Sequence, residues 1–309
     1  MKHISVLTKE VLEGLAVKSG EDFIDCTVGD GGHSQNILKL SEPDGKIFAI
    51  DLDPVSLAAA RKKIGPAGDR VRFIQGNFKD LKSIAENENI TEIDGVLFDL
   101  GYSSRQMDEP NRGFSFSSVD LDMRYNQSLG GLTASDIVND WPVGELIRIF
   151  KEYGEERLAG PIAKEIVSQR SEEKLDSESL RQLIADIYKR RFRRHSRLDP
   201  ATKVFMALRI AVNDELKALE GGLEAAIDLL APGGRIAVIS FHSLEDRIVK
   251  HKFREEARDC VCGPEAPVCV CNHKPKLKIV TRKPIVATPK EIKENQRSRS
   301  AKLRVATKL

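Results

Sequence analysis

Short apolar runs alternate with amphipathic stretches over the first hundred residues of the chain. Four of the runs are rich in branched and aromatic side chains, as buried strands are: residues 22–26, 46–50, 71–75 and 95–99. Between them, helical stretches are predicted at residues 33–40 and from Pro54, which suits a first helical turn, to Lys63. This alternation predicts an α/β fold with a doubly wound parallel sheet and helices on both faces.

The alternation stops after Leu100. Residues 102–129 are rich in Ser, Gly, Asp and Arg, which predicts a long, structured loop. Residues 134–189 have the apolar spacing of amphipathic helices and no strand alternation. The middle of the chain is therefore expected to differ in architecture from its beginning.

The strand pattern returns after this region. One helix is predicted over residues 200–230, and residues 235–240 (RIAVIS) again have the composition of a buried strand. The simplest organisation is one doubly wound domain, made of residues 1–103 and 201–309. A mainly helical insertion, residues 104–200, would interrupt it.

Composition places the chain among globular proteins. Its 309 residues are 40% hydrophobic and 31% charged, a balance that excludes the disordered and fibrous classes. No run reaches the ~20 apolar residues of a membrane helix, and residues 1–15 lack the apolar stretch of a secretory signal peptide. Five cysteines are too few for a disulfide scaffold in a chain of this length. We therefore expect a reducing, cytoplasmic compartment and no membrane association.

The net charge of the chain is only +2, but its C-terminal segment is strongly basic. Residues 273–309 contain 12 Lys and Arg against two acidic residues, and a second basic cluster occupies residues 189–197. Such local positive fields favour a polyanion as partner, and arginine favours phosphate groups. The alternative is a solvated helix face and an unstructured tail. The candidate phosphate contacts are Arg190, Arg191, Arg193 and Arg194.

A glycine-rich turn, DCTVGDGGH over Asp25–His33, follows the first predicted strand. Its glycines let the backbone approach a ligand closely, and the helix that begins near His33 offers free N–H groups. The spacing differs from GxGxxG, and Asp30 would repel a pyrophosphate. The second strand ends at Asp51, the position at which an acidic residue binds ribose hydroxyls in nucleotide-binding sheets. The pattern favours a nucleoside without phosphates over a dinucleotide.

A nucleoside with a positively charged substituent meets these conditions, and S-adenosylmethionine is the obvious one. Its sulfonium tolerates nearby carboxylates such as Asp25, Asp30 and Asp99. The segment Gly76–Phe78 follows the third strand, where it is well placed to flank an adenine ring. A purely structural strand–turn–helix connection is the alternative.

Several blocks of the chain closely resemble the bacterial RsmH (MraW) family. They are Asp25–Ser34, Asp94–Met123, Ala201–Glu215 and Gly233–Lys250. The resemblance spans nearly the whole chain and implies a class I S-adenosylmethionine-dependent methyltransferase fold, with a helical insertion for RNA recognition. It further implies methylation of the N4 amine of a cytidine in 16S rRNA, in the decoding (P-site) region of the small ribosomal subunit.

The resemblance also implies a set of cofactor contacts by position. They fall on Gly31, Gly32, His33, Asp51, Phe78, Asp99 and Gln106. Most of them agree with the pocket expected at the strand ends, whereas Gln106 comes from the resemblance alone.

The cytosine amine is a poor nucleophile because its lone pair is delocalised into the ring. Hydrogen-bond acceptors on the amine protons would favour the pyramidal nitrogen of the transition state, and Asp99 and Ser103 are the candidate catalytic residues for this role. The alternative for Asp99 is that it only binds the methionine ammonium group.

Four of the five cysteines lie within twelve residues, as Cys260-Val261-Cys262 and Cys269-Val270-Cys271. Four thiolates suit a tetrahedral zinc ion, although the spacing is CxC and not CxxC. The alternative is a pair of reduced thiol clusters in an extended loop.

The residue patterns alone, without the family resemblance, are compatible with two other functions. One is a nucleotide-dependent oxidoreductase on a similar sheet, which Asp30 disfavours. The other is a non-catalytic RNA-binding factor for ribosome assembly. The sequence also leaves open the oligomeric state, a homodimer included, and whether the substrate is naked RNA or the assembled subunit.

Overall fold

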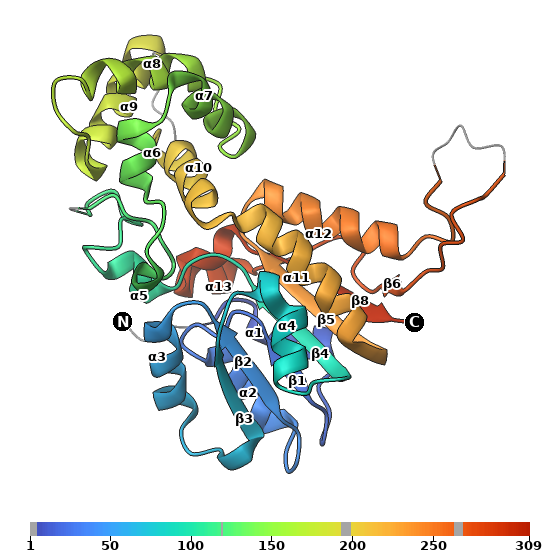
Figure 1. Ribbon diagram of the computed structural model, residues 1–309. Coiled ribbons are helices and arrows are strands. Elements are labelled where there is room, and N and C mark those ends of the chain that lie inside the picture. The colour runs from blue at the N-terminus through green and yellow to red at the C-terminus, as the bar shows by residue number, and fades with distance from the viewer. Residues whose placement is uncertain (1–4, 119, 193–198, 263–267) are drawn as a thin grey trace. The chain divides into compact units, whose positions relative to one another are not determined.

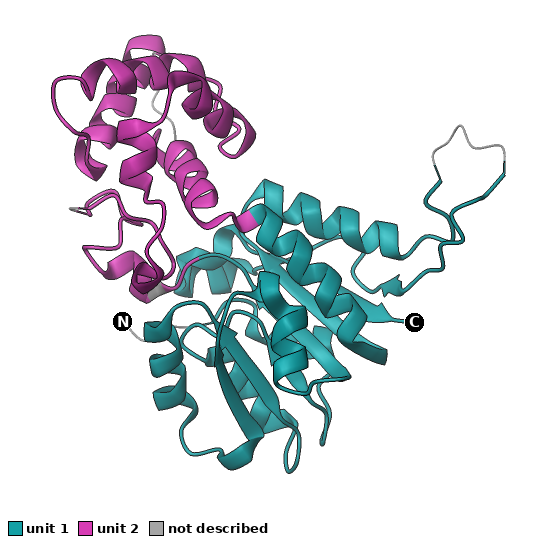
Figure 2. Ribbon diagram, viewed as in Figure 1, with its two compact units in different colours: residues 1–101, 216–309 teal, residues 102–215 magenta. Residues whose placement is uncertain are grey.

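The structure is a computed structural model that describes residues 5–118, 120–192, 199–262 and 268–309 (Figure 1). The chain divides into two compact units (Figure 2). The sheet unit contains residues 1–101 and 216–309, and the helical unit contains residues 102–215. Arg193 and Arg194, two of the predicted phosphate contacts, lie outside the described residues.

An eight-stranded sheet forms the centre of the sheet unit. Its strands, in spatial order, are β3 (Val71–Gln75), β2 (Ile47–Asp51), β1 (Phe23–Asp25), β4 (Ile93–Asp99), β5 (Leu230–Ser240), β8 (Lys302–Lys308) and β6 (Leu277–Ile279), with β7 (Ile285–Val286) also paired to β8. The pairings among β1 to β5 are parallel, whereas β8 is antiparallel to its three neighbours. The five runs predicted as strands form β1 to β5, and the predicted doubly wound α/β fold is confirmed.

Helices cover both faces of this sheet (Figure 1). They are α1 (Thr8–Leu15), α2 (Gly32–Leu40), α3 (Pro54–Ile64), α4 (Leu81–Asn87), α11 (Glu215–Leu229), α12 (Ser243–Glu256) and α13 (Pro289–Glu294), with the short 3-10 turns η1 (Gly68–Arg70), η2 (Phe78–Asp80) and η4 (Gln296–Ser300). Successive strand residues point to opposite faces. Val96 and Phe98 of β4 accordingly join the buried cluster of α4, α11 and α12, whereas Leu97 joins that of α1 and α2.

The helical unit has a hydrophobic core of its own. Its elements are α5 (Ser104–Asp108), η3 (Gln127–Leu129), α6 (Ala134–Asp140), α7 (Val143–Glu152), α8 (Ala159–Gln169), α9 (Ser177–Arg191) and α10 (Thr202–Asn213). Buried Arg112 organises the loop that precedes η3, because its Nη2 donates to the carbonyl oxygens of Arg124 (3.4 Å) and Tyr125 (2.8 Å). In the described part of the chain, no helix combines the length and the apolar composition needed to cross a bilayer.

The prediction of one continuous helix over residues 200–230 is wrong. Two helices, α10 and α11, occupy this segment, and Asp214 separates them. Asp214 adopts a left-handed conformation (φ 48°, ψ 40°), which ends α10. A non-glycine residue rarely adopts this conformation, so residue composition alone did not indicate the break.

The observed boundary between the two units differs from the predicted one because of α10. Val204, Phe205 and Leu208 of α10 are buried in the core of the helical unit. The compact helical unit therefore covers residues 102–215, whereas the sequence pattern predicted an insertion of residues 104–200. The apolar face of α10 accounts for the difference, because it is buried among the other helices.

The basic C-terminal segment contributes strands to the sheet and is not an unstructured tail. Leu303 and Val305 of β8 are buried in the sheet unit. Arg304 is only 7% exposed, and its Nε donates to Oδ1 of Asp246 at 2.7 Å. Lys302 Nζ lies 3.3 Å from Oδ2 of the same carboxylate. At least these two basic residues therefore stabilise the fold.

Candidate active site

Three aspartates end three neighbouring strands of the sheet. Asp25, Asp51 and Asp99 are the last residues of β1, β2 and β4, and β1 pairs in parallel with both of the others. The carboxyl ends of parallel strands meet at one edge of a sheet, and ligands of open α/β sheets bind there. The structure thus gathers the predicted acidic residues where a ligand is expected.

The glycine-rich turn connects β1 to α2. Gly31 precedes α2 with a left-handed backbone (φ 81°), and a Cβ atom at this position would lie 3.1 Å from Cα of Ala60 in α3. Gly32 is crowded as well, because a Cβ atom there would collide with Oγ of Ser5. Glycine at both positions lets the turn pass close to its neighbours. The first N–H groups of a helix have no partner within that helix, so the start of α2 suits a negatively charged group.

Asp51 accepts two backbone hydrogen bonds. The N–H of Gly29 donates to Oδ2 (2.8 Å), and the N–H of Asp53 donates to Oδ1 (2.9 Å). Burial raises the pKa of Asp51 to about 7, although both N–H groups act to lower it, and the carboxylates of Asp53 and Asp25 add to the rise. The Asp51 carboxyl group therefore changes charge near neutral pH, which is a common property of functional sites.

Asp25 has a structural role at the same edge. Its carboxylate is buried and accepts hydrogen bonds from Oγ of Ser34 (2.6 Å) and from the N–H of Thr27 (3.1 Å). Burial raises the pKa of Asp25, and the hydrogen bond from Ser34 opposes that rise. Asp25 thus joins the end of β1 to the first turn of α2, a role that its place in the sequence did not indicate.

His33 and Asp99 face each other at the centre of the edge. Nε2 of His33 lies 3.6 Å from Oδ2 of Asp99, and His33 is only 5% exposed. The N–H of Asp99 donates to Oγ1 of Thr27 (2.6 Å), which fixes the end of β4 to the turn. Among the described residues, neither ring nitrogen of His33 nor Oδ1 of Asp99 has a hydrogen-bond partner, although all three atoms are buried. Because buried polar atoms normally have partners, this arrangement fits a bound molecule with donors and acceptors.

Phe78 follows β3 and begins η2. Its ring contacts Phe98 of β4 edge-on, with the ring centroids 5.5 Å apart. Gly222 of α11 lies directly against it, because a Cβ atom there would come within 2.8 Å of Cδ2 of Phe78. These contacts hold the aromatic ring against β4 and α11, packed on the buried cluster that covers this face of the sheet.

Ser103 and Gln106 belong to the helical unit, where they bond to each other. The N–H of Gln106 donates to Oγ of Ser103 (3.2 Å), and Oε1 of Gln106 accepts from the N–H of Ser103 (2.8 Å). This reciprocal arrangement is a capping box at the start of α5. The pattern Ser-x-x-Gln was visible in the sequence and could have predicted this cap.

The remaining predicted residues belong to α9 of the helical unit and to the loop between α12 and β6 of the sheet unit. Arg190 and Arg191 are exposed in the last turn of α9, and Nη2 of Arg190 lies 3.3 Å from Oε1 of Glu165. The cysteines of the two CxC segments come together in the sheet unit, with the four Sγ atoms within 4.8 Å of one another.

The fold and this site together define a class of enzyme. The sheet has five parallel strands in the order β3-β2-β1-β4-β5. The antiparallel strand β8 lies next to β5, and β6 lies on the other side of β8. A glycine-rich turn after β1 and acidic residues at the ends of β2 and β4 complete the pattern. This is the architecture of a class I methyltransferase.

Comparisons with known proteins agree with this class. The model of the MraW methylase family matches residues 1–309, and the chain belongs to this family. The ribosomal RNA small subunit methyltransferase H of Trichlorobacter lovleyi is 50% identical over 309 residues, covering 99% of this chain and 98% of that protein. The protein of the same name from Symbiobacterium thermophilum is 48% identical over 311 residues, covering 99% of this chain and 96% of that protein.

Among solved structures, the SAM-dependent O-methyltransferase of Thermotoga maritima aligns with a TM-score of 0.42 at 13% identity, covering 100% of this chain and 68% of that one. The family membership confirms the resemblance seen in the sequence and the predicted enzyme class, a methyltransferase.

Proposed function

We propose that this chain transfers a methyl group from S-adenosyl-L-methionine to the N4 amine of one cytidine in 16S rRNA, in the decoding (P-site) region of the small ribosomal subunit. Membership of a methylase family supports the reaction type, and the names of the relatives support small-subunit rRNA as the substrate. The main structural support for a ligand-binding pocket is the buried pair His33–Asp99. Three of its buried polar atoms have no hydrogen-bond partner among the described residues, and a bound ligand would supply partners.

The residues at the sheet edge suit this methyl donor, which supplies an electrophilic methyl group on a sulfonium. Asp51 binds the ribose hydroxyls, and Phe78 flanks the adenine. The N–H groups at the start of α2, after Gly31, suit the carboxylate of the methionine part. The acidic edge would repel a phosphate but tolerates a cationic donor, which favours the sulfonium compound over a dinucleotide. The resemblance remains the support for Gln106 as a further contact.

Asp99 accepts a hydrogen bond from an amino group through Oδ1, the oxygen that has no partner among the described residues. Two amino groups of the reactants suit this position: the methionine ammonium group and the N4 amine of cytosine. An acceptor on the cytosine amine would concentrate the nitrogen lone pair on the attacking atom, and Ser103 is the proposed second acceptor. In either role, Asp99 orients a reactant, and orientation is a major source of rate acceleration.

The RNA substrate has to present an unstacked base to this pocket, which single-stranded or loop RNA does at low cost. Arg190 and Arg191, together with Arg193 and Arg194, are the proposed phosphate contacts. The exposed ion pair between Arg190 and Glu165 contributes at most about 1 kcal/mol, so that guanidinium is readily transferred to a phosphate. We place the enzyme in the cytoplasm, with its ribosomal substrate.

The substitution Asp99→Ala tests the pocket. We expect Asp99→Ala to lose a charge-assisted hydrogen bond of about 1.5–3 kcal/mol, an effect of about 10- to 150-fold. Calorimetry measures donor affinity, and nucleoside analysis of methylated small subunits measures turnover. Weaker donor binding would assign Asp99 to the ammonium group, and slower turnover at unchanged affinity would assign it to the cytosine amine. If neither quantity changes, the proposed pocket is wrong.

A further inference from the structure

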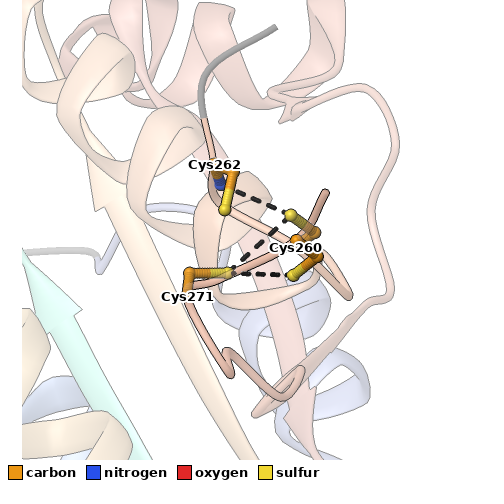
Figure 3. A group of neighbouring side chains, drawn as sticks. Cys260, Cys262 and Cys271 are labelled. Atoms are coloured by element: carbon orange, nitrogen blue, oxygen red, sulfur yellow. Dashed lines mark hydrogen bonds between the residues drawn. The ribbon is translucent and has the colours of Figure 1, made fainter. Parts of the chain in front are cut away.

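The loop between α12 and β6 brings four thiols to one point. Cys260 and Cys262 lie on the arm that leaves α12, and Cys269 and Cys271 lie on the arm that leads to β6. Figure 3 shows that the side chains of Cys260, Cys262 and Cys271 point toward one another. The four Sγ atoms all lie within 4.8 Å of one another. Residues that are close in the fold thus come from two separate arms of the loop.

The distances between the sulfur atoms match a single tetrahedral ion. A zinc–sulfur bond of about 2.3 Å requires an edge of about 3.8 Å between two sulfurs of a regular tetrahedron. Sγ of Cys271 lies 3.6 Å from that of Cys269 and 3.7 Å from that of Cys260. A disulfide would instead need a separation of about 2.05 Å, and all four cysteines are free thiols.

Backbone N–H groups are directed at the same sulfurs. The N–H of Cys262 donates to Sγ of Cys260, that of Val261 to Sγ of Cys271, and that of Val270 to Sγ of Cys262, each at 3.4 Å. Donors around a thiolate stabilise its negative charge and orient it, as outer contacts of metal ligands do. The loop backbone therefore supplies donors of the kind that suit metal-bound thiolates.

Hydrophobic burial does not account for the convergence of the two described arms of this loop. Val268 and Val270 are 70% and 77% exposed, and Val261 is also exposed. The base of the loop is closed by the N–H of Lys276, which donates to the carbonyl oxygen of Glu256 at 2.7 Å. In the described part of the loop, the convergent thiols and the N–H groups directed at them join the two arms beyond this bond. Small segments without a core commonly rely on a metal or disulfides.

We propose that Cys260, Cys262, Cys269 and Cys271 bind one zinc ion. Four protein ligands leave no open coordination position, so this is a structural site and takes no part in methyl transfer. The ion fixes the two arms of the loop against each other between α12 and the outer strand β6. Its role is independent of the proposed RNA substrate.

The full-length protein, purified under reducing conditions without added metal, provides the first test. Elemental analysis should find about one zinc per chain, and X-ray absorption should show four sulfur neighbours at about 2.3 Å. Iron in place of zinc, substoichiometric metal, or disulfides between these cysteines in the freshly purified protein would each overturn the proposal.

A matched pair of variants provides the second test. Cys271→Ser removes one ligand, whereas Val270→Ser changes the exposed neighbouring side chain and leaves all four thiols in place. We expect Cys271→Ser to lower zinc affinity by at least about 100-fold, because changes to outer contacts alone cost 10- to 100-fold, and Val270→Ser to bind zinc as the natural chain does. Limited proteolysis within residues 257–276 should accelerate in Cys271→Ser and in the natural chain treated with chelator. Full zinc affinity in Cys271→Ser would contradict the assignment.

Discussion

We expect the charge state of Asp51, the proposed partner of the ribose, to make donor binding sensitive to pH. Burial raises the pKa of this carboxyl group to about 7, from an ordinary value of 3.8. Ribose hydroxyls donate hydrogen bonds, so the ionised carboxylate is the better partner. We therefore expect affinity for an adenosyl ligand to rise with pH and to level off above neutral pH.

The magnitude follows from the pKa. With a pKa of about 7, only about one-tenth of the Asp51 carboxyl groups are ionised at pH 6, so a ligand that needs the ionised form binds about tenfold more weakly there than at pH 8. The same group affects stability with a definite sign. Its folded pKa lies above its unfolded pKa, so the folded chain binds more protons between pH 3.8 and about 7. The contribution of Asp51 to stability therefore falls as pH rises through that window, by at most about 4 kcal/mol.

Calorimetric titration with S-adenosylhomocysteine at pH 6, 7 and 8 measures the affinity. This ligand carries the ribose but not the sulfonium, so its pH profile does not include the attraction between the Asp51 carboxylate and a sulfonium charge. Asp51→Asn cannot ionise and should bind more weakly at pH 8, with the Asp51-dependent part of the pH profile removed. An identical pH profile in the natural chain and in Asp51→Asn would show that Asp51 does not bind the ribose in its ionised form.

Two further predictions concern the turn and the RNA contacts. Gly31→Ala combines a strained left-handed backbone, about 1–2 kcal/mol, with a close approach to Ala60, about 1–3 kcal/mol. Gly20→Ala carries the same kind of strain (φ 79°) in open space, so urea denaturation should show a larger loss for Gly31→Ala, and equal losses would contradict the crowding argument. Replacing Arg190 and Arg191 with Ala should reduce the slope of log affinity for single-stranded RNA against log salt by about 0.7 for each phosphate that is no longer neutralised. An unchanged slope would remove these residues from the RNA interface.

The sheet was predictable because its strands have simple patterns. Short apolar runs that end in Asp51 or Asp99 identified both the strands and the edge at which they meet. The C-terminal strands could not be predicted because their basic residues, such as Lys302 and Arg304, suggested a polyanion partner. In the structure, both residues form ion pairs with Asp246. Charge counts do not reveal that a cation has a partner from a distant segment.

The parts of the site that could not be predicted depend on three-dimensional proximity. The spacing of His33 and Asp99 in the sequence does not reveal that their side chains lie 3.6 Å apart. The bond from Ser34 to Asp25 likewise depends on how the turn folds back on β1. The break at Asp214 arises from the packing of two helices in different cores, which local propensity does not encode.

The proposed reaction transfers a methyl group to a cytosine amine at the acidic edge of the sheet. The most direct test of this reaction uses small ribosomal subunits that lack the modification. They are incubated with the enzyme and isotopically labelled S-adenosylmethionine. Mass spectrometry of the digested rRNA should find the label in N4-methylcytidine at a single position, and Asp51→Ala and Asp99→Ala should reduce the yield at limiting donor concentration. Label on another base would rule out the cytosine amine as the acceptor, and equal labelling by the natural chain and both variants would rule out the acidic edge as the donor site.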